Sequence, residues 1–152
     1  MRKLVVLAIA CGVLVPGLAV AQEHITQGPM WECSGYRTKP GQYSNYMEFL
    51  RTHYLPMTEA GKEAGLIVDY KVFVQPPSDP NDWNILICTL YEDAGAAMDF
   101  NADNDKKWDE LAAAHYKTDD EDEQMETLSS RFEMRTFTGT NYVREVTLKA
   151  LE

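Results

Sequence analysis

The chain has 152 residues, a length that suits a single domain. Its 24 acidic residues outnumber its 14 basic ones, which gives a formal net charge of −10 at pH 7. This balance argues against nucleic acid as a partner and against binding to an anionic membrane surface, because both depend on clustered positive charge.

Residues 1–21 have the features of a secretory signal peptide. Arg2 and Lys3 form a positive start, an apolar run follows, and Ala19-Val20-Ala21 is a small-residue cleavage site. A transmembrane anchor is the weaker alternative, because Pro16 interrupts a run that is already short for a span. We expect export to the periplasm or the medium, a mature chain near −12 in charge once Arg2 and Lys3 are lost, and no membrane span elsewhere.

Four strands are predicted in the mature chain. Residues 22–29 are polar and predict a flexible N-terminus, followed by a strand over Met30–Tyr36. A long hairpin joins Leu66–Val74 to Trp83–Tyr91 through a loop with three prolines, and Thr140–Leu148 is the last strand. The first hairpin strand has one half-polar face, which suits a sheet edge, whereas the second is apolar on both faces, which suits a central position.

The remaining segments have helical periodicity. A helix is predicted from Ser44 to Ala64, with Gly65 as its stop and a kink at Pro56. A second helical region follows Glu92, with an irregular turn over 101–105, and an acidic run over 118–123 begins a third helix.

This order of elements predicts one α+β domain over residues 30–150. Right-handed crossovers give an antiparallel sheet of order 4-1-3-2 with the helices on one face. Strands one and three are then neighbours, which brings Cys33 and Cys88 onto adjacent strands. An exported protein permits a disulfide between them, and two buried free thiols are the equal alternative.

The arrangement resembles the dimeric α+β barrel superfamily, most of all its NIPSNAP-like and antibiotic-biosynthesis-monooxygenase-like branches. The likeness covers Met30 to Leu148 and depends on an aromatic first strand, the helix from Tyr46 to Pro56 that ends at Ala64-Gly65, the hairpin, and Asp105–Leu111. The resemblance implies a ferredoxin-like unit and a homodimer whose two sheets pack face to face, with a cavity between each sheet and its helices. Some members are cofactor-independent oxygenases or isomerases, but fold alone does not assign a reaction.

Candidate site residues follow from this cavity. His53 lies on the apolar stripe of the first helix, where an imidazole can act as a general base, with Tyr54 and Tyr70 as assisting candidates. The alternative is a core histidine bonded to backbone. The candidate ligand-binding residues are aromatic, although aromatic residues on strands are more often plain core: Trp31, Tyr46, Trp83 and Tyr91.

A calcium site is a weaker hypothesis. Residues 99, 101, 103, 105 and 110 place acids or amides at EF-hand spacing, but Asn104 holds the glycine position and Lys106 the usual apolar one. We therefore predict no metal and no cofactor. The predicted function is an exported homodimer that binds a small apolar or aromatic ligand. The alternatives are a cofactor-independent oxygenase or isomerase and a structural or interaction protein with a filled core.

Overall fold

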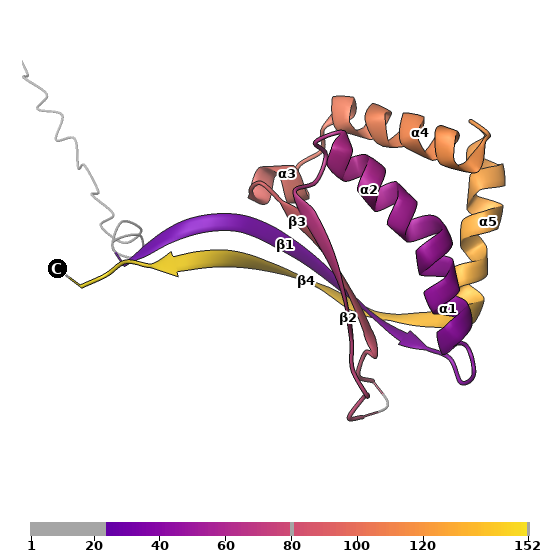
Figure 1. Cartoon of the computed structure of the whole chain (residues 1–152), viewed down its shortest axis with the longest axis horizontal. Coiled ribbons are helices and arrows are strands. Elements are labelled where there is room, and N and C mark those ends of the chain that lie inside the picture. The colour runs from indigo at the N-terminus through magenta and orange to yellow at the C-terminus, as the bar shows by residue number, and fades with distance from the viewer. Residues whose placement is uncertain (1–23, 80, 152) are drawn as a thin grey trace, which may run out of the picture.

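The structure is a computed structural model that describes residues 24–79 and 81–151, so the predicted signal peptide over 1–21 lies outside the described residues. Within the described residues, four strands form one antiparallel sheet and six helical segments accompany it (Figure 1). The strands are β1 (Ile25–Thr38), β2 (Asp69–Val74), β3 (Ile85–Tyr91) and β4 (Arg135–Leu148). The helical segments are α1 (Tyr43–Phe49), η2 (Leu50–Tyr54), α2 (Leu55–Glu63), α3 (Ala94–Met98), α4 (Ala102–Tyr116) and α5 (Glu121–Met134). The α+β class is therefore as predicted.

The sheet has the order β2-β3-β1-β4, which becomes 4-1-3-2 when it is followed from the β4 edge. The half-polar hairpin strand β2 lies at an edge, and the apolar strand β3 lies in the middle. The predicted adjacency of Cys33 and Cys88 is also present, because they are paired residues of β1 and β3 with Cα atoms 4.1 Å apart. They form a disulfide that joins the two central strands.

Two strand boundaries were predicted wrongly. Strand β1 begins at Ile25, so most of the segment predicted as a flexible N-terminus belongs to the sheet, and β4 begins at Arg135 instead of Thr140. Before Met30, β1 pairs only with β4, and this part of the two strands extends as a ribbon away from the helices (Figure 1). The register shift between Gln27 and Met30 accommodates Pro29, which cannot donate to a ladder.

The first long helix is continuous but changes its winding in the middle. Segments α1, η2 and α2 follow one another without a gap, and η2 is a π-helix in which the N–H of Leu55 donates to the carbonyl of Leu50. Pro56 lies in the first turn of α2, where its missing donor is least costly. The predicted kink therefore takes the form of a π-helical segment just before the proline. Gly65 follows the helix with a φ of 72°, as its role as the stop requires.

The acidic stretch around Asp103 is the start of a helix, not a metal-binding loop. Asn101 caps α4 by accepting from the N–H groups of Asp103 and Asn104, each at 3.1 Å. Asp103 and Asp105 lie in the first turn, where negative charge complements the helix dipole. The helical backbone from Ala102 onward is incompatible with the twelve-residue loop of an EF-hand, so the irregular turn and the calcium hypothesis are both corrected.

The helices α1, α2, α4 and α5 lie on one side of the sheet, and the opposite side has no helical layer (Figure 1). On the covered side, Tyr46 and Leu50 pack with Ile85 of β3 as a buried cluster. Among these helices, α4 packs on α2, where the indole of Trp108 lies directly over the buried Gly61.

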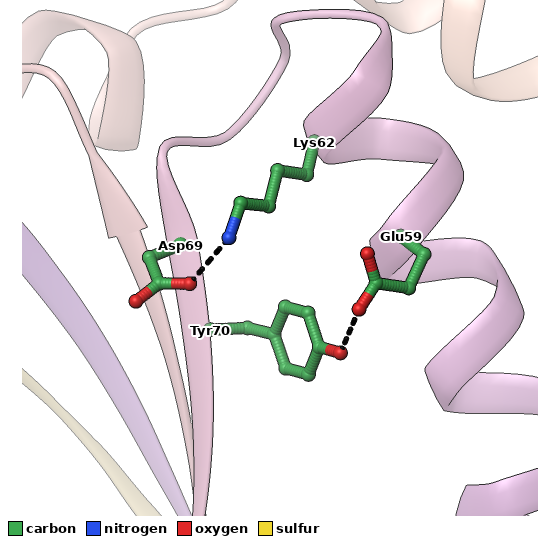
Figure 2. A network of polar contacts seen from close by, with 4 residues as sticks. All are labelled: Glu59, Lys62, Asp69 and Tyr70. Atoms are coloured by element: carbon green, nitrogen blue, oxygen red, sulfur yellow. Dashed lines mark hydrogen bonds and ion pairs between the residues drawn. The ribbon is translucent and has the colours of Figure 1, made fainter.

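Polar side chains also tie α2 to the edge strand β2. Figure 2 shows Lys62 of α2 beside Asp69, with Nζ and Oδ1 2.8 Å apart, and the hydroxyl of Tyr70 donating to the carboxylate of Glu59. Both contacts are solvent-exposed, so neither contributes much to stability. Among the described residues, no helix has both the length and the apolar content needed to cross a membrane.

Candidate functional site

A cavity of about 250 Å³ lies between the sheet and the helical layer, and we call it the central cavity. It is framed by the long helix on one side, by α4 and α5 on another, and by β1, β3 and β4 at its base. Most of its lining is aromatic or aliphatic, and no acidic residue contributes: Tyr36, Tyr46, Phe49, Leu50, His53, Tyr54, Met57, Ile87, Tyr116, Leu128, Arg131 and Arg135.

The π-helical segment supplies three of these lining residues. Leu50, His53 and Tyr54 all belong to η2, and Pro56 follows it closely. π-Helical turns inside α-helices are often found at functional sites, because the widened turn redirects the side chains that follow. The irregular winding therefore occurs in a segment of which three of the five residues line the cavity.

His53 makes a close contact with a second histidine from α4. Its Nδ1 lies 3.3 Å from Nε2 of His115, and its ring stacks on Tyr116 with 5.8 Å between centroids. A hydrogen bond between the two nitrogens requires a proton on one and a free lone pair on the other. Burial lowers the pKa of His53, and the charge of a protonated His115 lowers it further. His53 is therefore neutral at neutral pH and able to accept a proton.

Two arginines, Arg131 and Arg135, also line the central cavity. Arg135 donates from Nη1 to the hydroxyl of Tyr46, and its guanidinium carbon lies 3.4 Å from the ring centroid of Tyr36. Arg131 belongs to α5, and its Nε is buried without a hydrogen-bond partner in the described part of the chain. The contact with Tyr36 places a cationic group against an aromatic face, which is a favourable cation–π arrangement.

Two tyrosines of the cavity, Tyr46 and Tyr54, are neutral phenols at neutral pH. Burial raises the pKa of Tyr46, although Arg135 opposes that change, and burial raises the pKa of Tyr54 to about 12. The Tyr54 hydroxyl is buried beside Thr89 and Thr58 but has no hydrogen bond of standard geometry. Tyr54 is thus a second polar residue of the cavity wall.

The structure brings together some of the residues predicted from sequence and separates others. His53, Tyr54 and Tyr46 line the central cavity, whereas Tyr70 lies outside it and donates to Glu59 (Figure 2).

The remaining three predicted aromatic residues do not line the central cavity either. Trp31 faces the side of the sheet without helices, where Nε1 donates to Glu145 at 2.7 Å. Trp83 precedes β3 and lies against Gly35, and Tyr91 is the last residue of β3. Strand alternation explains why Trp31 does not line the central cavity, since residues on one face of β1 cannot reach the other.

Sequence reasoning missed the two arginines, Tyr116 and the pairing of the two histidines. Arg131 lies in the last turn of α5, whereas Arg135 is the first residue of β4 and has an extended backbone. The available signal was the position of Arg131 three residues after Leu128, which places both side chains on one face of α5. The partner histidine was not accessible, because His53 and His115 are 62 residues apart in the chain.

No group of three or more His, Cys, Asp or Glu side chains is arranged to hold a metal ion within residues 24–79 and 81–151. Comparison of the chain with protein-family models found no match, and neither did comparisons with curated proteins and with solved structures. The geometry of the central cavity is therefore the basis for a functional assignment.

Proposed function

We propose that this protein binds a small apolar or aromatic ligand in the central cavity. The observation that carries the proposal is the cavity itself, about 250 Å³ of space walled by aromatic rings between the sheet and the helices. Ligand sites are concave and mostly apolar, with a few convergent polar groups that fix orientation. Here those groups are His53, Tyr54 and the two arginines.

Filling the cavity tests this proposal. Leu128→Trp adds an indole to the cavity wall, and Leu151→Trp adds the same indole to a side chain that is 99% exposed. With the neutral apolar dye Nile red as the probe, the wild type and Leu151→Trp should show the same saturable fluorescence increase, and Leu128→Trp should show little. Equal binding by all three proteins would place the dye elsewhere and leave the filled-core alternative as the better account.

We further propose export and assembly as a dimeric α+β barrel. Export is supported by the signal features of residues 1–21 and by a disulfide, a bond that persists in oxidising compartments. Intact mass of the mature protein tests it, since cleavage after Ala21 leaves Gln22 as the first residue.

Pairing of two chains is supported by the side of the sheet that lacks helices. That face carries Phe73 at 46% exposure and Val143 at 50%, together with Trp31 and Leu86, around the central disulfide. A contiguous apolar face of this kind marks an interaction surface. In analytical ultracentrifugation, Phe73→Asp should shift a dimer to monomer, while Phe100→Asp, at a position that is 82% exposed and not among the residues around the disulfide, should not. A monomeric wild type would contradict the proposed pairing.

A second candidate function is a cofactor-independent oxygenase or isomerase with His53 as general base. The specific observation in its favour is a neutral imidazole in the cavity wall, with its pKa lowered by burial and by His115. His53→Ala should abolish turnover but retain ligand binding, whereas His24→Ala, at an exposed position, should change neither. Retained turnover in His53→Ala would remove this residue from the mechanism.

A further inference from the structure

The two arginines of the central cavity have no negatively charged partner in the described part of the chain. The ion pairs present there join Lys39 to Glu133, Arg51 to Glu48, Lys62 to Asp69 and Lys106 to Glu110. None of them reaches Arg131 or Arg135, and no acidic side chain lines the cavity. The lack of an acidic partner is unusual in a chain that has ten more acidic than basic residues.

A buried guanidinium N–H without a hydrogen-bond partner lowers the stability of the fold. Arginine stays protonated in proteins, so it cannot relieve the cost of burial by losing its proton. The Nε of Arg131 is buried and makes no hydrogen bond, and Arg135 spends one donor on the neutral phenol of Tyr46. Burial raises the pKa of Tyr46, so this phenol does not supply the missing negative charge at neutral pH. The terminal Nη groups of Arg131 and Nη2 of Arg135 make no hydrogen bond to the described residues, so they remain for an anion from outside the chain.

We infer that the ligand is a small aromatic carboxylate, with its carboxylate between Arg131 and Arg135 and its ring against the aromatic wall. This inference rests on the proposed function and adds the chemical class of the ligand. A guanidinium binds a planar carboxylate through parallel N–H donors, and Phe49 and Tyr116 of the same cavity lining offer ring faces for stacking. A cavity of about 250 Å³ accommodates one or two fused rings.

Isothermal titration with matched probes tests the charge of the ligand. Benzoate and 2-naphthoate are compared with benzamide and 2-naphthamide, which keep the ring and lose the charge. The wild type should bind each acid about tenfold or more tightly than its amide, the effect of one charge-assisted hydrogen bond. Arg131→Gln should lose this preference for the acid while its affinity for the amide stays within about twofold.

Two further variants separate charge from folding. Arg131→Lys keeps the positive charge and should retain part of the preference, and Arg51→Gln removes an exposed arginine outside the cavity and should behave like the wild type. Equal binding of acids and amides by the wild type would overturn the inference and leave the proposed function intact. Absence of binding by all four probes would overturn both.

Discussion

Replacing both Cys33 and Cys88 with alanine removes the covalent link between the two central strands. The disulfide closes a loop with a sequence separation of 55 residues. In the chain-entropy model, a loop of this length reduces the entropy of the unfolded state enough to stabilise the fold by about 4 kcal/mol at 25 °C. That figure is close to the whole stability of many small domains, so the variant should be marginally stable.

Urea unfolding of the mature protein measures this effect. With a slope of about 2 kcal/mol per molar urea, the midpoint of Cys33→Ala/Cys88→Ala should lie about 2 M below that of the oxidised wild type. The wild type unfolded and refolded under reductant should match the variant, and reductant should not change the variant itself. Equal midpoints for oxidised and reduced wild type, or two free thiols per native chain, would refute the reasoning.

Packing and titration make two further predictions. An added Cβ at Gly61 would lie 2.1 Å from Cη2 of Trp108, so Gly61→Ala should destabilise the protein by about 1–2 kcal/mol, after allowing for the better helix propensity of alanine. The control is Gly95→Ala, whose nearest contacts at 3.3 Å are side-chain oxygens, and a thermal shift of equal size in both variants would contradict the packing argument. The lowered pKa of His53 means that the unfolded chain takes up a proton first as the pH falls below the ordinary value of 6.5. The contribution of neutral His53 to the free energy of unfolding is thus complete above pH 6.5 and declines as the pH falls toward the folded pKa. His53→Gln should therefore show a smaller decrease in the free energy of unfolding between pH 7.5 and 5.5 than the wild type. An unchanged pH profile in this variant would contradict the prediction.

The fold was predictable where local patterns and the sheet agree. The apolar alternation of the Ile85–Tyr91 strand indicated a central position, and the half-polar face of its hairpin partner indicated an edge. The start of β1 was not predictable, because Gly28 and Pro29 are poor strand residues that are held in the sheet by pairing with a segment more than a hundred residues away.

The candidate site was predictable only in part, for a similar reason. His53 and Tyr46 stand on the buried stripe of one helix, so periodicity alone placed them toward the sheet. The position of Trp31 outside the central cavity was not predictable, because the alternation of a strand shows that it has two faces but not which face the helices cover. Arg131 was missed because an arginine on a polar helix is usually solvated, and only the tertiary structure shows its buried Nε.

The most direct test of the central claim is native mass spectrometry of the mature protein purified from its own host, compared with the same sample after denaturation. The account predicts that the native mass exceeds the denatured mass by one small molecule per chain, that the released compound is an aromatic acid, and that Leu128→Trp carries none of it. Identical masses per chain before and after denaturation would contradict the claim that the central cavity holds a ligand.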